Sequence, residues 1–224
     1  MSVQKFYNKI SEDYPELLRK AVPGYDDMLN TILEYIPPNF KPERILELGC
    51  GSGNLTDKVI NRFPGSIMDV VDISGDFINF CKVRFKDRTK IIYHQMDFKK
   101  LNFKANSFDL VVSSISIHHI KDLEKLKLFE IIYNILKPQG KLIFADQTKG
   151  SNEYIYKKHI EIWYKEAIKL GSSEEDWKMW MDHQNKHDFH STVIEHIDWL
   201  KAANFKNIDI LWKNLLWTVF YGEK

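Results

Sequence analysis

Three glycines at alternate positions, Gly49, Gly51 and Gly53, follow the short apolar run 45–48 and precede the helix-forming stretch 54–60. Glycine at alternate positions lets a backbone turn sharply after a strand, and it lets a ligand approach without meeting a Cβ atom. The sequence therefore predicts a strand, a turn and a helix in this order, with a ligand held against the bare backbone of the turn.

Strand-length apolar runs alternate with amphipathic helices over the first 150 residues, a pattern typical of a parallel α/β sheet. Residues 151–203 are predicted to form helices without strands, and the end of the chain is predicted to form a strand hairpin. The expected strands are 44–48, 66–72, 90–94, 108–113, 141–146, 207–212 and 215–222, and the expected core helices are 53–63, 75–85 and 122–136.

The composition narrows the class of protein. A chain of 224 residues with 44% hydrophobic and 28% charged residues is ordinary for a globular domain. A net charge of +1 without a long lysine or arginine run argues against a nucleic-acid partner. The start lacks an apolar signal core, and no window approaches the roughly 18 apolar residues of a membrane span. We therefore expect a cytoplasmic protein that does not enter the membrane.

Polar residues follow the expected strands, where ligands bind in an open parallel sheet. Asp72 lies 19 residues beyond Gly53, and its carboxylate suits the two hydroxyls of a ribose. Asp97 suits an adenine amino group, and the ring of Phe98 beside it suits the base. The layout predicts an adenosine-containing ligand.

Glu47 helps to distinguish between a dinucleotide and S-adenosylmethionine as the ligand. The spacing is Gly-x-Gly-x-Gly, not the Gly-x-Gly-x-x-Gly of dinucleotide-binding folds, and Glu47 stands where those folds usually have an apolar residue. A carboxylate beside the loop would repel a pyrophosphate but suits a cation. S-adenosylmethionine, which is cationic and carries no phosphate, therefore fits better than NAD.

With these motifs in order, residues 45–146 resemble the class I S-adenosylmethionine-dependent methyltransferases. The match also includes Phe108-Asp109 and the stretch 136–140. The resemblance implies a doubly wound, Rossmann-like α/β sheet of seven strands, mostly parallel with an antiparallel last strand, and S-adenosyl-L-methionine as cofactor. It implies that the glycine loop holds the methionine end of the cofactor and that Asp72 holds the ribose. It also implies that Asp97 binds the adenine amino group and that Ser114 lies near the sulfonium. The implied cofactor contacts are Glu47, Gly49, Cys50, Gly51, Gly53, Asp72, Ile73, Asp97, Phe98 and Ser114.

Both ends of the chain resemble a second family, the carboxy-S-adenosylmethionine synthases, through residues 14–25 and 199–212. In those enzymes an arginine after the fifth strand holds the extra carboxylate of the modified cofactor. Here Met181 stands at that place, and Arg88 is the last arginine of the chain. A carboxylated cofactor would leave its charge unpaired, at a cost of several kcal/mol. Ordinary S-adenosylmethionine and methyl transfer are therefore favoured.

Methyl transfer needs the nucleophilic atom of the acceptor to be aligned with the methyl group, on the side opposite the sulfur. A base is needed only when that atom starts protonated. The predicted candidates are His118 and His119 after the fourth strand, followed by Asp146, Tyr14 and Tyr25. The alternative is that one histidine packs on the sheet and the other caps the following helix.

A second group of histidines, His183, His187 and His190 with Asp182 and Asp188, has spacings that would suit a metal. We expect a solvated segment there and no metal, and the sequence leaves the question open. Nearby aromatic residues are expected to pack on the core more than to cage a ligand. They are Trp163, Tyr164, Trp177 and Trp180, together with Met181.

We predict one domain over residues 1–224. It comprises N-terminal lid helices (1–40), a cofactor-binding core (41–150), a helical lid insertion (151–198) and a last helix with the strand hairpin (199–224). The expected partner is a small-molecule methyl acceptor with an apolar or aromatic body, and a homodimer stays open. Two other functions stay open as well: a carboxy-S-adenosylmethionine synthase-like enzyme of tRNA wobble-uridine modification, and a non-catalytic S-adenosylmethionine-binding subunit.

Overall fold

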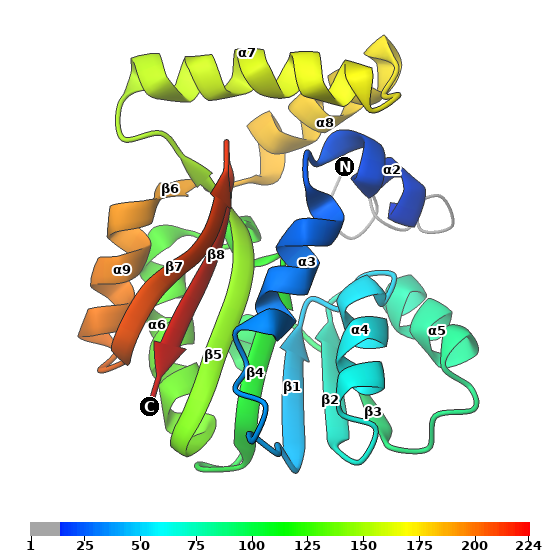
Figure 1. Cartoon of the computed structure of the whole chain (residues 1–224), viewed down its shortest axis with the longest axis vertical. Coiled ribbons are helices and arrows are strands. Elements are labelled where there is room, and N and C mark those ends of the chain that lie inside the picture. The colour runs from blue at the N-terminus through cyan, green and yellow to red at the C-terminus, as the bar shows by residue number, and fades with distance from the viewer. Residues whose placement is uncertain (1–13) are drawn as a thin grey trace.

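A computed structural model describes residues 14–224 of the chain, which fold around one twisted sheet (Figure 1). The strands lie in the order β3-β2-β1-β4-β5-β8-β7, and the short strand β6 pairs with β5. Their bounds are β1 Arg44–Leu48, β2 Ile67–Asp72, β3 Ile91–Gln95, β4 Phe108–Ser114, β5 Leu136–Lys149, β6 Ser191–Thr192, β7 Lys206–Asn214 and β8 Trp217–Glu223.

The pairing confirms the predicted fold class. Strands β3, β2, β1, β4 and β5 are parallel, whereas β8 runs antiparallel to both β5 and β7. Strand β7 is therefore the sixth parallel strand, and β8 lies between it and β5. One expectation was wrong: the region 151–203 contains a strand, because β6 pairs with β5 through Thr148 opposite Ser191 and Lys149 opposite Thr192.

Helices cover both faces of the sheet. They are α2 Tyr14–Ala21, α3 Tyr25–Glu34, α4 Asn54–Arg62, α5 Gly75–Arg84, α6 Asp122–Ile135, α7 Glu153–Lys169, α8 Glu174–His187 and α9 Val193–Ala202, with the short 3₁₀ turns η1 Phe98–Lys100 and η2 Ile117–His119. One core cluster joins α3, α4 and α5 to the sheet, and the other joins α6 and α9 to its opposite face.

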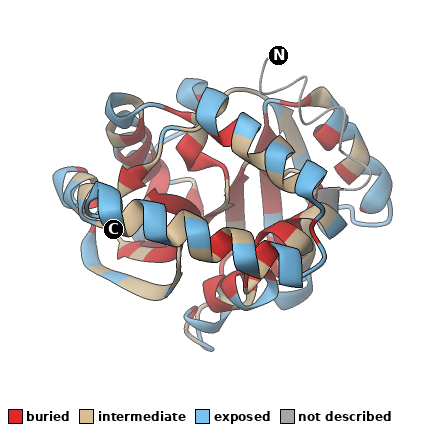
Figure 2. Ribbon diagram, turned by 90° about the horizontal axis from the view of Figure 1, so that it is seen from above, coloured by how far each residue is buried: buried red, intermediate tan, exposed pale blue. Residues whose placement is uncertain are grey.

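Alternation along the strands produces this two-sided core. Ile45 and Val70 belong to the α3–α4–α5 side, whereas Leu46 and Val71 belong to the α6–α9 side. Successive side chains of a strand point to opposite faces, so each strand contributes to both layers. Figure 2 shows buried residues concentrated in the strands and in the inward faces of the helices.

Helices α2, α7 and α8, which we call the lid, lie over the carboxyl ends of the parallel strands (Figure 1). Trp163 of α7 fastens the lid: its Nε1–H donates to the carbonyl oxygen of Ala21 at 2.5 Å, and its ring packs edge-on against Trp217 of β8. Trp177 of α8 also packs edge-on against the ring of Trp163. The expectation that lid aromatics pack on the core is confirmed for Trp163, which is 3% exposed.

Candidate functional site

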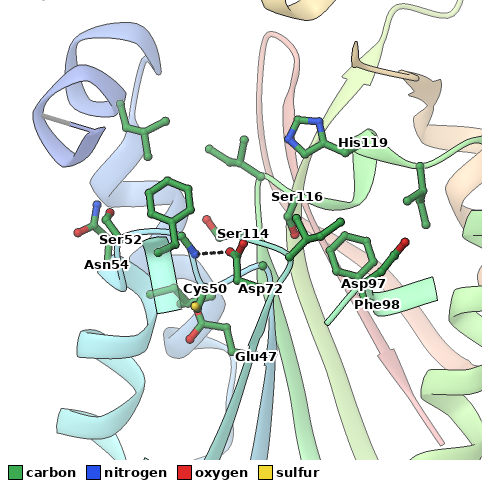
Figure 3. A pocket seen from close by; sticks show the side chains of 18 of the residues that line it. Glu47, Cys50, Ser52, Asn54, Asp72, Asp97, Phe98, Ser114, Ser116 and His119 are labelled. Atoms are coloured by element: carbon green, nitrogen blue, oxygen red, sulfur yellow. Dashed lines mark hydrogen bonds between the residues drawn. The ribbon is translucent and has the colours of Figure 1, made fainter. Parts of the chain in front are cut away.

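A cavity opens at the carboxyl ends of β1, β2 and β4, beneath the lid (Figure 3). It brings together all the cofactor contacts named from the sequence except Gly53. Those that line it are Glu47, Gly49, Cys50, Gly51, Asp72, Ile73, Asp97, Phe98 and Ser114. Tyr25 and His119 line it too. Asn54 and Ser52 stand at one side, Asp97 and Phe98 at the other, and His119 lies above Ser116.

The glycine loop has the backbone that its sequence predicts. Gly49 and Gly51 have φ of 70° and 50°, in the left-handed region that favours glycine. A Cβ on Gly49 would lie 2.4 Å from the Cβ of Ser116, so the loop and the β4–η2 turn touch where glycine alone fits. Gly53 serves the fold instead: it precedes α4 with φ of 80°, and a Cβ there would lie 2.6 Å from the ring of Phe85.

Asp72 ties the loop to the next turn. Its Oδ2 accepts a hydrogen bond from the N–H of Gly51 at 2.9 Å, and its Oδ1 accepts one from Ser74 at 2.8 Å. Burial raises the pKa of Asp72, and these two backbone hydrogen bonds oppose the rise. Ser74 caps α5, because its side chain accepts from the N–H of Phe77. Asp72 is therefore free of the capping role and presents a buried carboxylate at the cavity wall.

Glu47 lies under the loop and is 1% exposed. Its Oε2 accepts a hydrogen bond from the hydroxyl of Thr56 on α4 at 2.6 Å. Burial raises the pKa of Glu47 to about 8, and the nearby carboxylate of Asp72 adds to the rise. A cation in the cavity would favour the ionised form of this pair of acids.

Asp97 begins the η1 turn: its Oδ1 accepts from the N–H of Lys99 at 2.9 Å, so it caps that turn while lining the cavity. Its Oδ2 lies 3.6 Å from Nζ of Lys99, which also lies 3.4 Å from Glu124. Phe98 is buried beside it. The acid and the ring are thus adjacent, as their sequence suggested.

The structure places the five predicted proton acceptors differently. His119 and Tyr25 line the cavity, whereas His118 lines a second, smaller cavity under the lid. Nδ1 of His118 lies 2.5 Å from Oδ1 of Asp146, and burial holds the pKa of His118 well below its usual value. Burial also raises the pKa of Tyr25 to about 12. The side chain of Tyr14 lies outside the part of the chain that the structure describes.

The second histidine group is not the solvated segment that we expected. His183 is 5% exposed, and the side chains of Asp188 and His190 are 4% and 6% exposed. Other side chains of the stretch are exposed, namely Asp182, Asn185, Lys186 and Phe189. The backbone N–H of Phe189 donates to the carbonyl of His118 at 2.7 Å, which docks the segment that carries Asp188 on the core.

Sequence reasoning missed several lining residues, namely Leu18, Ser52, Asn54, Leu55, Phe77, Lys99, Ile115, Ser116 and Ile120. Asn54 had a local signal, since it directly follows the glycine loop. Its amide nitrogen contacts the hydroxyl oxygen of Tyr25 at 3.2 Å. Leu18 comes from a helix that precedes the sheet, so only the tertiary packing reveals it.

Comparisons with known proteins agree with this geometry. Residues 45–140 match the family model of a methyltransferase domain. A carboxy-S-adenosyl-L-methionine synthase of Helicobacter pylori (strain J99 / ATCC 700824) is 23% identical over 98% of this chain and 93% of its own length. A phosphoethanolamine N-methyltransferase of Plasmodium falciparum (isolate 3D7) is 30% identical over 74% of this chain, a match that spans 54% of that protein.

Among solved structures, Haemonchus contortus phosphoethanolamine N-methyltransferase 2, in complex with phosphomonomethylethanolamine and S-adenosylhomocysteine, has the same fold with a TM-score of 0.72 at 19% identity. The match covers all of this chain and 61% of that chain. No helix within residues 14–224 has the length and apolar character needed to cross a membrane. The predicted resemblance is confirmed: residues 45–140 match a methyltransferase domain, and the described residues have the fold of a solved methyltransferase.

Proposed function

We propose that the protein binds S-adenosylmethionine in the cavity at the glycine loop and transfers its methyl group to a small organic acceptor with an apolar or aromatic body. The observation that carries this proposal is the cavity itself. It joins the loop, Asp72 and Asp97 to His119 and Tyr25 on one continuous wall. Residues suited to the cofactor and residues suited to an acceptor therefore face the same space.

The cofactor roles follow from this wall. The glycine loop suits the methionine end, the carboxylate of Asp72 suits the ribose, and Asp97 suits the adenine amino group. Phe98 supplies an apolar surface for the base. The cationic sulfonium and ammonium groups of S-adenosylmethionine would favour the ionised forms of Asp72 and Glu47, whose negative charge under the loop then suits them.

The acceptor's chemistry follows from the residues beyond Ser114. There the wall continues through Ile115 and Ile120, with Leu18 reaching in from α2. Among the described residues lining the two cavities, Lys99 is the single lysine or arginine, and it already faces Asp97 and Glu124. A phosphate on the acceptor would thus lack a cationic partner. The acceptor is therefore apolar or aromatic in body, unlike the phosphorylated bases in the names of some relatives.

The methyl group of the sulfonium is already activated, so the protein mainly has to align the acceptor with it and exclude water. Tyr25 keeps its proton at neutral pH, since its pKa is about 12, and so it positions the acceptor through its hydroxyl. His119 is the cavity residue placed to take a proton from an acceptor that arrives protonated. His118 is held away from the cavity and serves as a support.

A second function, that of a carboxy-S-adenosylmethionine synthase, is favoured by one observation: the similarity to such enzymes runs over nearly the whole chain. The lid argues against it. Met181, at the place of their carboxylate-binding arginine, packs against the apolar core cluster. A non-catalytic cofactor-binding subunit is disfavoured because the cavity extends beyond Ser114 to His119.

The test is to identify the cofactor and then the methyl acceptor. Mass spectrometry of the small molecules released from the purified protein should give S-adenosylmethionine or S-adenosylhomocysteine, whereas the carboxylated cofactor would identify a synthase. Incubation with methyl-labelled S-adenosylmethionine and fractions of a metabolite extract should then label an apolar or aromatic small molecule. Cofactor binding with no label transferred to any fraction would support the non-catalytic subunit and overturn the proposal.

A further inference from the structure

Three histidines surround one oxygen of a buried carboxylate, Oδ1 of Asp188, and a fourth, His190, lies 3.8 Å from the other oxygen. His118 and His119 come from η2, His183 comes from α8, and Asp188 follows the end of α8. From Oδ1 of Asp188 the distances are 3.0 Å to Nδ1 of His119, 3.5 Å to Nε2 of His183 and 3.8 Å to Nε2 of His118. We call these four residues the histidine–aspartate cluster. It joins the lid to the core.

The spacing within this cluster suits a metal ion. Zinc binds imidazole nitrogen and carboxylate oxygen at roughly 2.0–2.2 Å, so ligand atoms at the corners of a tetrahedron lie about 3.3 Å apart. The distances from Asp188 Oδ1 fall on both sides of that value. Ligand atoms of His118, His119 and Asp188 also all lie within 4.8 Å of one another. Small side-chain rotations would therefore bring them onto one ion.

The surroundings supply the support that metal ligands usually have. Nδ1 of His118 is hydrogen-bonded to Asp146, which directs Nε2 toward Asp188, as in the carboxylate–histidine–metal arrangement. The backbone hydrogen bond from Phe189 to His118 fixes the segment that carries Asp188. His190 is occupied elsewhere, because its two nitrogens contact the hydroxyl of Tyr156 at 2.9 Å and the amide oxygen of Gln147 at 2.8 Å.

Burial points the same way. The side chains of His118, His183 and Asp188 are 3%, 3% and 4% exposed. A buried carboxylate among imidazoles offers lone pairs and negative charge to a cation.

We propose that the histidine–aspartate cluster binds one divalent transition-metal ion, preferably Zn²⁺, through His118 Nε2, His119 Nδ1 and Asp188 Oδ1. His183 is the nearest group for a fourth position. The ion would fasten the end of α8 to η2. Coordination through Nδ1 would leave the proton on Nε2 of His119, so His119 could take a proton from the acceptor, as proposed above, only in the metal-free protein. This site departs from our expectation of no metal, and among the histidines of the second group it includes His183 alone.

The test is metal binding by the whole chain, which is read independently of methyl transfer. Protein stripped with a chelator should take up one equivalent of Zn²⁺ against a chromophoric competitor, should melt at a higher temperature with Zn²⁺, and should leave Mg²⁺ in solution because imidazole suits the softer ion. Co²⁺ in place of Zn²⁺ should give the visible absorption of a nitrogen and oxygen site. Asp188→Asn and His119→Gln should lose the stoichiometric binding.

Two further variants separate this site from incidental histidine binding. Asp146→Asn should weaken Zn²⁺ binding about 10- to 100-fold without abolishing it, because it removes the support of His118 and no ligand. His187→Gln, one turn after His183 on the same helix, should bind like the unaltered protein. Circular dichroism checks that Asp188→Asn is folded. Equal Zn²⁺ binding by the unaltered protein and by Asp188→Asn, or no uptake by either, would overturn the proposal.

Discussion

Asp72 and Gly51 are joined by a hydrogen bond of 2.9 Å from the loop N–H to the carboxylate, so the residue proposed to hold the ribose also shapes the loop proposed to hold the methionine end. The second oxygen of Asp72 accepts from Ser74. Both carboxylate oxygens thus meet backbone donors before any ligand arrives. This dual role makes the choice of substitution important.

Asp72→Asn should weaken S-adenosylmethionine binding by about 10- to 100-fold, since a hydrogen bond to a charged group contributes about 1.5–3 kcal/mol. The amide nitrogen would face one of the two N–H donors, and the negative charge would be lost. Isothermal titration calorimetry measures the affinity. Asp76→Asn, an exposed carboxylate four residues along on α5, is the matched control and should bind normally. Unchanged affinity in Asp72→Asn would remove Asp72 from the site.

Gly49→Ala should destabilise the protein and impair cofactor binding, because the new Cβ would lie 2.4 Å from Cβ of Ser116 and because φ of 70° strains a residue with a side chain. Adding Ser116→Gly should recover about 1–3 kcal/mol of unfolding free energy relative to the sum of the single changes. Urea denaturation measures this coupling. The rest of the loss, from backbone strain, should persist in the double variant.

The control for this pair is Gly65→Ala. A Cβ at Gly65 meets nothing within 4 Å, and its φ is not in the left-handed region. Its unfolding free energy should therefore stay close to that of the unaltered protein. If the unfolding free energy of Gly49→Ala equals that of Gly65→Ala, the contact between the loop and the β4–η2 turn does not contribute to stability.

The contrast between Asp72 and Asp188 shows what the sequence could predict. Asp72 ends a strand that follows the glycine loop, and strand, turn and helix follow each other locally, so its place in the cavity was predictable from spacing. Asp188 lies some 70 residues after His118 and His119 in the sequence. The three side chains come into contact only because the lid docks on η2. Its polar neighbours are typical of a solvated segment, which is why its burial was mispredicted.

Some strands could likewise be predicted from the sequence, and one could not. Apolar runs predicted β1 to β5 and the hairpin of β7 and β8, because burial on both faces of a sheet needs continuous apolar sequence. Strand β6 escaped prediction, since Ser191 and Thr192 are polar and pair with β5 through backbone groups alone. Tyr25 was named from the resemblance of the N-terminal segment, whereas its partner Asn54 came to light only in the fold.

Glu47 should make the unfolding free energy of the cofactor-free protein depend on pH. Its folded pKa of about 8 lies above the ordinary value of 4.5, so its contribution to stability is complete below 4.5 and is lost as the pH rises through 8. Relative to Glu47→Gln, the unaltered protein should therefore lose up to about 1.4 kcal/mol per pH unit between about pH 5 and pH 8.

Urea denaturation at several pH values in this window measures that difference. Glu130→Gln, which changes an exposed carboxyl group on α6, is the control and should follow the unaltered protein at every pH. A constant difference between the unaltered protein and Glu47→Gln across the window would mean that Glu47 is ionised in the folded chain.

Trp163→Phe should loosen the lid while leaving the core intact. The change removes the indole N–H that donates to the carbonyl of Ala21 at 2.5 Å, and it shrinks the ring that packs against both Trp177 and Trp217. Losing one buried hydrogen bond and part of an aromatic contact should cost about 1–3 kcal/mol. Hydrogen exchange followed by mass spectrometry should show faster exchange in α2 and α7, with β1 and β4 unchanged. Tyr154→Phe on the exposed face of α7 is the control, and equal exchange in the two variants would show that Trp163 does not hold the lid to the sheet.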